Sequence, residues 1–145
     1  MFKHILLPTD GSELSAAAIQ QGIRFAQSIG AKVTGLCVMP QQHPFFYETE
    51  IPMEALEQAA QRYKQQAGTY LAAIEKTARD AGVACSVVYE KNDSPYEAII
   101  RAAEQKGCDL IMMASHGRGG VGALLLGSET QKVLTHSKIP VLVVR

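Results

Sequence analysis

Residues 3–38 read KHILLPTDGSELSAAAIQQGIRFAQSIGAKVTGLCV and carry one complete strand–helix–strand unit. The apolar runs Lys3–Pro8 and Lys32–Val38 have the length and the near-continuous hydrophobicity of strands covered on both faces. Between them, Glu13–Ile29 repeats apolar residues at spacings of three and four, as a helix does, and Gly30 is placed to end it. This order predicts two parallel strands joined by a right-handed crossover.

The rest of the chain repeats the alternation. Further strands are expected at Cys85–Tyr89, Asp109–Ala114 and Pro140–Val144, and further helices at Glu54–Ala81, Ser94–Lys106 and Ser128 to about His136. Ser94 and Ser128 are each followed three residues later by Glu97 or Gln131, which predicts a capping box at both helix starts. The order β-α-β-α-β-α-β-α-β predicts an α/β fold, a doubly wound five-stranded parallel sheet with helices on both faces. The 145 residues suit a single domain, residues 1–145.

Composition limits the class of protein. Fourteen Lys and Arg residues balance fourteen Asp and Glu residues, so we expect no long-range positive field that would attract nucleic acid or an anionic membrane. The three cysteines, Cys37, Cys85 and Cys108, show no CxxC spacing, which argues against a disulfide framework and against a zinc site. The N-terminal apolar run is too short for a secretory signal, and no run approaches the roughly 18 residues of a membrane span. We therefore expect a cytoplasmic protein.

The loop SHGRGGVGALLLGSET, residues 115–130, carries the clearest binding signal. Gly117 and Gly127 bracket nine residues, and Ser128 follows directly where a helix is expected to begin. Glycine lets a backbone approach a ligand closely, and a helix start offers free N–H groups at the positive end of the helix dipole. The pattern favours a phosphate site at Gly127 and Ser128, with a simple helix cap at Ser128 as the alternative.

Two better-known phosphate motifs are excluded. The spacing Gly117-x-Gly119-x-x-Gly122 matches the dinucleotide fingerprint formally, but it falls in the fourth crossover and not in a first βα turn. A Walker P-loop requires a glycine followed by Lys and then Ser or Thr, which this sequence lacks. What remains is a looser phosphate cradle.

Three polar side chains have a binding interpretation and a structural one. Arg118, the only Lys or Arg in the loop, could pair with a phosphate or be solvated, and His116 could contact a ribose or be held by local backbone. Asp10 could orient a base, hold a metal or merely form the turn after the first strand. That turn should face the glycine loop, because both follow strands where the winding direction reverses. No catalytic triad, Cys/His pair or metal-ligand cluster is recognisable, so the signal is for binding.

Residues 39–52, MPQQHPFFYETEIP, contain three prolines and three successive aromatic residues. We expect no regular structure in this stretch. A loop of this length is typical of a lid or of a surface that binds a partner. Alternatively, Phe45, Phe46 and Tyr47 could pack on the long second helix.

Over its whole length, from ILLPTDGS at Ile5–Ser12 to PVLVV at Pro140–Val144, the chain resembles the universal stress protein family. The nucleotide-binding branch of that family has the pattern Gly-x2-Gly-x9-Gly-Ser/Thr. Gly117 and Gly127-Ser128 match its last elements in spacing, whereas Ala114 occupies the position of the first glycine, which in the family lies close to the ribose. The resemblance implies an adenine nucleotide alpha hydrolase-like fold and a site for ATP, AMP or ADP, with Mg²⁺ at Asp10.

The resemblance also implies which residues form the site. Contacts with adenine and ribose are expected from the ends of the first, second and fourth strands: Pro8, Thr9, Asp10, Val38, Met113 and Ala114. Contacts with the phosphates are expected from Gly117, Arg118, Gly127, Ser128, Glu129 and Thr130, and His116 is expected near the ribose. A homodimer is expected through the last strand, Pro140–Val144, as an apolar edge that pairing would cover.

The implied function is that of a regulatory stress-response dimer that binds ATP or a related adenine nucleotide. One alternative is a dimeric interaction module of the same family that binds no nucleotide, which Ala114 and the aromatic stretch favour. The other is a slow nucleotide hydrolase that uses Asp10 to hold a metal. We expect no dedicated catalytic residue, because no general base is evident beyond His116.

Overall fold

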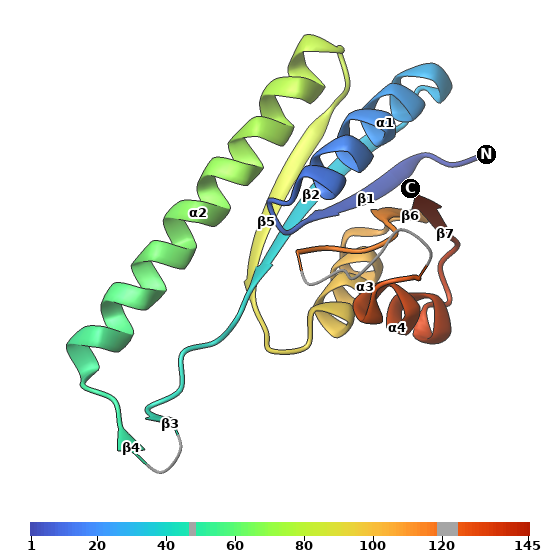
Figure 1. Ribbon diagram of the computed structural model, residues 1–145. Helices are drawn as coiled ribbons and strands as arrows, with labels where there is room; N and C mark the ends of the chain where they lie inside the picture. The colour runs from blue at the N-terminus through green and yellow to red at the C-terminus, as the bar shows by residue number, and fades with distance from the viewer. Residues whose placement is uncertain (47–48, 119–124) are drawn as a thin grey trace.

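A computed structural model of the protein, which describes residues 1–46, 49–118 and 125–145, has a parallel sheet at its centre (Figure 1). The five strands lie in the order β5-β2-β1-β6-β7, and every neighbouring pair is parallel. Their bounds are β1 His4–Thr9, β2 Lys32–Met39, β5 Cys85–Lys91, β6 Leu110–Ala114 and β7 Val141–Val144. The predicted α/β fold class, with five parallel strands wound in two directions, is confirmed.

Helices cover both faces of this sheet, as predicted. The helices α1 (Glu13–Ile29) and α2 (Met53–Asp80) pack on one face, and α3 (Pro95–Lys106) and α4 (Ser128–His136) on the other (Figure 1). Each face of the sheet has its own hydrophobic core, and β1 contributes side chains to both. Ile5 and Leu7 point towards α1 and α2, whereas Leu6 points towards α3. All three side chains are fully buried, which explains why the strand is a continuous apolar run.

The direction of winding reverses between β1 and β6. From β1 the chain proceeds outward to β2 and β5, and the later strands are added on the other side as β6 and β7. The loops that follow β1 and β6 diverge towards opposite faces and leave a crevice between them, the usual position of a ligand in sheets of this type.

The start of α3 differs from the prediction. Ser94 is the N-cap residue, but its side chain makes no capping hydrogen bond, so the predicted capping box with Glu97 is wrong. The carboxylate of Glu129, in α4, accepts a hydrogen bond from the backbone N–H of Tyr96 at 2.9 Å. A residue of a neighbouring helix therefore caps α3, which a local sequence pattern cannot show.

The start of α4 is also shifted by one residue. Gly127 is the N-cap and Ser128 is the first helical residue, so the predicted cap at Ser128 is wrong. The side chain of Gln131 donates a hydrogen bond to the Leu126 carbonyl at 3.0 Å and closes no capping box. The Ser128 side chain therefore does not cap the N-terminus of α4.

The stretch after β2 contains regular structure, contrary to the prediction. Strand β3 (Phe45–Phe46) pairs antiparallel with β4 (Thr49–Glu50) in a short hairpin before α2. The Phe45 side chain is 63% exposed, so it does not pack on the helix. The corresponding predictions for the Phe46 side chain and for Tyr47 lie outside the described residues.

The helix α2 extends well beyond the sheet (Figure 1). Its buried residues, Ala67, Leu71, Ile74 and Ala78, all lie in its second half. Its first half leads away to the hairpin, so the helix reaches from the sheet core to an exposed tip. None of the helices that the structure describes is long and apolar enough to cross a membrane.

Candidate functional site

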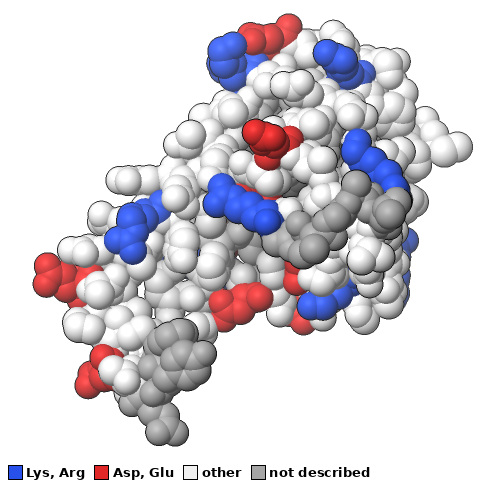
Figure 2. Space-filling view, viewed as in Figure 1, with Lys and Arg blue, Asp and Glu red and all other residues white. Residues whose placement is uncertain are grey.

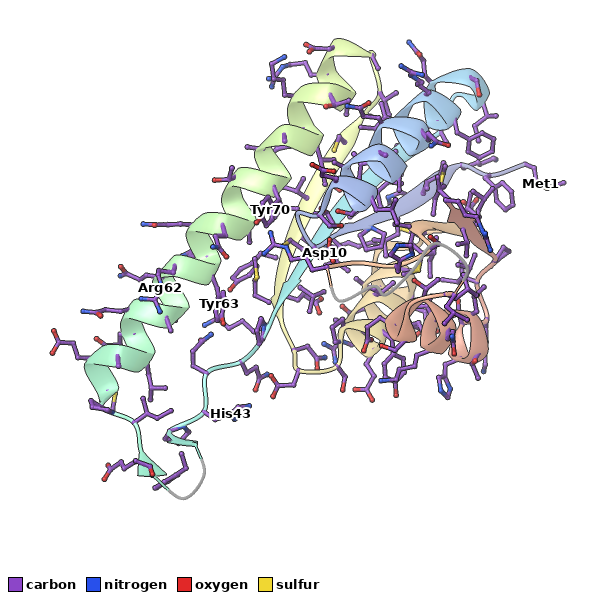
Figure 3. The ribbon with its side chains drawn as sticks, in the orientation of Figure 1. Met1, Asp10, His43, Arg62, Tyr63 and Tyr70 are labelled. Carbon is purple, nitrogen blue, oxygen red and sulfur yellow. The ribbon has the colours of Figure 1, made fainter. Side chains whose placement is uncertain are left out.

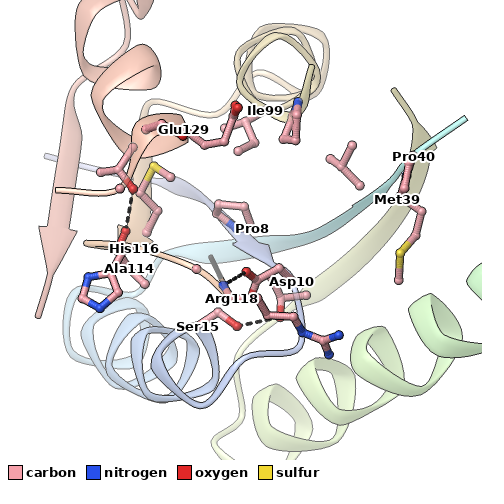
Figure 4. A pocket seen from close by; sticks show the side chains of 18 of the residues that line it. Pro8, Asp10, Ser15, Met39, Pro40, Ile99, Ala114, His116, Arg118 and Glu129 are labelled. Carbon is pink, nitrogen blue, oxygen red and sulfur yellow. Dashed lines mark hydrogen bonds between the residues drawn. The ribbon is translucent and has the colours of Figure 1, made fainter. Parts of the chain in front are cut away.

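A cavity of about 520 Å³ opens at the carboxyl ends of β1, β2 and β6, at the point where the winding reverses (Figure 4). This volume lies within the range of about 300–1,000 Å³ typical of small-molecule sites. The structure brings together around it all the site residues expected from the sequence: Pro8, Thr9, Asp10, Val38, Met113, Ala114, His116, Gly117, Arg118, Gly127, Ser128, Glu129 and Thr130. Residues far apart in the chain thus form one site.

Asp10 joins the two loops at the crevice. Its Oδ1 accepts a hydrogen bond from the Ser12 N–H at 2.9 Å. Its Oδ2 accepts one from the Arg118 N–H, also at 2.9 Å (Figure 4). A Cβ atom at Gly117 would collide with the same Oδ2, so only glycine lets the loop approach this closely. The expected position of the Asp10 turn opposite the glycine loop is confirmed.

The Asp10 carboxylate is ionised at neutral pH. Burial raises its pKa, but hydrogen bonds from Ser12, Arg118 and Ser15 favour the charged form and together lower the pKa below its ordinary value. The cavity therefore contains a fixed negative charge. Such a group can accept hydrogen bonds from sugar hydroxyls or serve as a ligand to a divalent cation.

Gly127, at the end of the glycine loop, lies against residues at the beginning of that loop. Its N–H donates to the Ser115 carbonyl at 2.8 Å, and a Cβ atom here would lie 2.9 Å from both Cα and Cβ of His116. The carbonyl of Gly127 accepts the first helical hydrogen bond, from Gln131 N–H at 3.0 Å. The earlier N–H groups of α4 have no partner within the helix, as at any helix start, and offer donors to an anion.

Arg118 is anchored to α2. Its Nη2 donates a hydrogen bond to the Tyr70 hydroxyl at 2.6 Å, and its guanidinium lies 5.8 Å from the centre of the Tyr70 ring. Figure 3 shows Tyr70 on the face of α2 that is turned towards Asp10. The guanidinium is therefore held by a defined partner, which neither sequence interpretation included.

Three further lining residues have hydrogen bonds that fix the wall of the cavity. The ring Nδ1 of His116 is 3.0 Å from the Ser115 hydroxyl. The Thr130 hydroxyl donates to the Ala114 carbonyl at 3.0 Å. Glu129, already bound to α3, also lies 3.4 Å from the Lys132 ammonium group. Thr130 and Glu129 thus hold the start of α4 against β6 and α3.

Comparison with known proteins places this architecture in a family. The model of the universal stress protein family matches residues 1–145. The chain belongs to this family. Universal stress protein MJ0531 of Methanocaldococcus jannaschii is 32% identical, over 100% of this chain and 83% of that protein.

Solved structures of the universal stress protein family share the fold. The structure of MJ0577, from the same archaeon, superimposes with a TM-score of 0.83 at 31% identity and covers 99% of this chain and 96% of that one. A universal stress protein in complex with cAMP gives a TM-score of 0.74 at 22% identity, covering 99% of this chain and 97% of that one. The fold is thus the adenine nucleotide alpha hydrolase-like arrangement.

Ala114, the departure from the universal stress protein pattern, lies at the end of β6. It pairs with Val144 in extended backbone, and only 7% of it is exposed. The methyl group therefore adds no conformational strain. Its effect on a ligand is limited to the space that the group occupies.

The lining also includes residues that the sequence did not single out. They are Ser15, Met39, Pro40, Tyr63, Gln66, Pro95 and Ile99, and most of them are apolar or aromatic. Tyr63 belongs to the apolar stripe of α2, a signal that predicts burial but no ligand. Gln66 gives no signal, because its proximity to the cavity depends on how α2 crosses the sheet.

The described residues contain no cluster of three His, Cys, Asp or Glu side chains that could hold a metal ion. A Mg²⁺ ion at Asp10 would therefore need ligands from the phosphates of a nucleotide and from water, which is how Mg²⁺ is commonly bound.

Charge around the site is mixed: on the face in Figure 2, basic and acidic side chains alternate over the described surface.

Proposed function

We propose that this universal stress protein binds ATP, or the related nucleotides ADP and AMP, in the cavity between the Asp10 turn and the glycine loop. The observation that carries the proposal is the Asp10–Arg118 backbone contact, which brings a carboxylate, a cation and the start of α4 to one cavity. A solved universal stress protein of the same fold is in complex with cAMP, which supports an adenine nucleotide as the ligand.

The chemistry of the lining suggests how a nucleotide would lie. The apolar lining residues Val38, Met39 and Ile99 suit the faces of an adenine ring. Asp10 would accept hydrogen bonds from ribose hydroxyls. The start of α4 and Arg118 would receive the phosphates, because both offer N–H donors with positive charge.

Binding of Mg²⁺ is part of the same proposal. Asp10 would hold the ion together with nucleotide phosphates, since its carboxylate is ionised and lines the cavity. The ion would offset the negative charge that Asp10 and the phosphates bring together. Binding of ATP should then be tighter with Mg²⁺ than with EDTA.

We further propose a cytoplasmic homodimer that pairs through β7. This strand lies at the edge of the sheet, and Leu142 is 38% exposed. An apolar edge strand left uncovered invites pairing with a second chain. Sedimentation at micromolar concentration should give twice the mass of the chain, and a monomeric mass would remove this part of the proposal.

Calorimetry tests the nucleotide site. Protein stripped of ligand by unfolding and refolding is titrated with ATP, ADP and AMP, each with and without Mg²⁺. We expect saturable heat for the wild type and a strong loss in Gly127→Val, whose larger side chain would collide with His116. No heat at millimolar nucleotide would overturn the proposal. Mass spectrometry of the protein as purified would also identify any nucleotide that is retained.

An interaction module that binds no nucleotide is the second candidate. The observation in its favour is the exposed tip near the start of α2, where Phe45 is 63% and Met53 is 72% exposed. Such apolar side chains are typical of surfaces that contact other proteins. The same titration separates the two functions, because a pure interaction module gives no heat with any nucleotide.

A further inference from the structure

Tyr70 contacts both loops of the crevice although it lies outside the cavity lining. A Cβ atom built at Gly11, in the turn after β1, would overlap the Tyr70 ring, so the ring lies directly against this glycine. The Tyr70 hydroxyl accepts the 2.6 Å hydrogen bond from Arg118, in the loop after β6. One side chain of α2 thus contacts the two loops that Asp10 also connects.

The Tyr70 contact changes what Arg118 can do. The Arg118 backbone is bonded to Oδ2 of Asp10, yet among the described residues the two side chains form no ion pair. The guanidinium lies instead on the Tyr70 ring and hydroxyl. Tyr70 therefore keeps the cation apart from the carboxylate, and both charges stay available to a ligand.

We propose that Tyr70 is a positioning residue that holds the Arg118 guanidinium at the phosphate end of the cavity and so favours phosphorylated over unphosphorylated adenosine. This inference rests on the proposed function. It adds a residue of α2 to a site otherwise built from strand ends and the glycine loop.

The preference follows from entropy and geometry. An arginine side chain loses much rotamer freedom when it is fixed, and here part of that loss occurs before a ligand arrives. Among the described residues, Tyr70 uses one of the five N–H donors of the guanidinium, and the other donors can serve phosphate oxygens. Without the hydroxyl, Arg118 would be free to pair with Asp10 and to neutralise both groups.

The test is the Tyr70→Phe variant, which removes the hydroxyl and keeps the ring against Gly11. Affinities for ATP, AMP and adenosine are measured by calorimetry. We expect ATP and AMP to bind roughly fivefold or more weakly, as for the loss of one hydrogen bond. Adenosine should change by less than about twofold, because it makes no phosphate contact.

The matched control is Tyr89→Phe. The Tyr89 hydroxyl is buried, finds no hydrogen-bond partner in the described part of the chain, and does not line the cavity. This second loss of a tyrosine hydroxyl should leave all three affinities unchanged. Thermal unfolding of both variants checks that the fold is intact.

A double-mutant cycle with Arg118→Ala completes the experiment. In the Arg118→Ala background, Tyr70→Phe should cause no further loss of ATP affinity if the hydroxyl acts through the guanidinium. Equal losses for ATP and adenosine, or an unchanged ATP affinity in Tyr70→Phe, would overturn the inference while leaving nucleotide binding in place. If the wild type binds none of the three ligands, the proposed function fails and the inference fails with it.

Discussion

Replacement of Gly127 by alanine tests whether the close approach of Gly127 to His116 supports the site. Gly127 has φ −62° and ψ 152°, which alanine adopts without strain, so any effect comes from the added methyl group. That carbon would lie 2.9 Å from Cα and Cβ of His116, whereas ordinary contacts begin near 3.4 Å. The start of α4 and the His116 backbone must therefore separate by about 0.5 Å.

This separation should affect stability and binding together. We expect the free energy of unfolding to fall by about 1–3 kcal/mol, the usual cost of overpacking. Nucleotide affinity should fall about tenfold or more, or about 1.4 kcal/mol, because the N–H donors of α4 move away from the residues that face them. Urea unfolding and calorimetric titration with AMP measure the two effects separately.

Gly68→Ala is the matched control for Gly127→Ala. Gly68 lies in α2, and a Cβ atom there meets nothing within 4 Å. The same substitution should raise the free energy of unfolding by about 0.5–1 kcal/mol through helix propensity and leave AMP affinity unchanged. Wild-type AMP affinity in Gly127→Ala would refute the account of the loop.

Other expected outcomes concern the core between the sheet and the helices α1 and α2, and a buried histidine. Gly22→Ala should lower the free energy of unfolding by about 1–3 kcal/mol in urea, because its methyl group would lie 2.5 Å from Cδ2 of the fully buried Leu7; unchanged stability would contradict this. Tyr89→Phe should raise the unfolding free energy by up to about 1 kcal/mol, since the buried hydroxyl has no partner among the described residues, and a loss of stability would show that it has one. Burial, with the nearby charge of Lys32, lowers the pKa of His4, whose Nε2 lies 2.7 Å from the Thr34 hydroxyl. The folded protein therefore prefers neutral His4, so its contribution to stability is complete above the unfolded pKa of 6.5 and is lost as the pH falls through the lower folded pKa. Urea midpoints measured downward from pH 7.5 should fall less steeply in His4→Gln than in the wild type, and equal slopes would exclude His4 as the cause.

The order of elements and the position of the cavity could be predicted from sequence because both depend on short-range patterns. Apolar runs such as Lys3–Pro8 and the helical spacing in Glu13–Ile29 reflect burial of individual elements, and the alternation of strands with helices leaves few topologies. In such a topology the carboxyl ends of β1 and β6 lie next to each other at one edge of the sheet, where the cavity is expected. All thirteen candidate residues consequently line one cavity, while their contacts with a nucleotide stay a prediction.

The capping of α3 and the position of Arg118 required the folded structure. Glu129 reaches Tyr96 across 33 residues of sequence, and Arg118 reaches Tyr70 across 48. Partners this far apart in the sequence depend on how whole helices pack. A local motif such as Ser94 with Glu97 carries no information about that packing. The hairpin after β2 was missed for a related reason, because two-residue strands carry too little periodicity to be recognised.

Local chemistry of the chain therefore accounts for the sheet, its helices and the glycine loop, since each depends on neighbours within a few residues. Tertiary packing alone decides which helix faces that loop. It places α2 beside the crevice, brings Tyr63 and Gln66 to the cavity and ties Arg118 to Tyr70. The physical reason is that these contacts arise only when the apolar stripe of α2 is buried against the sheet.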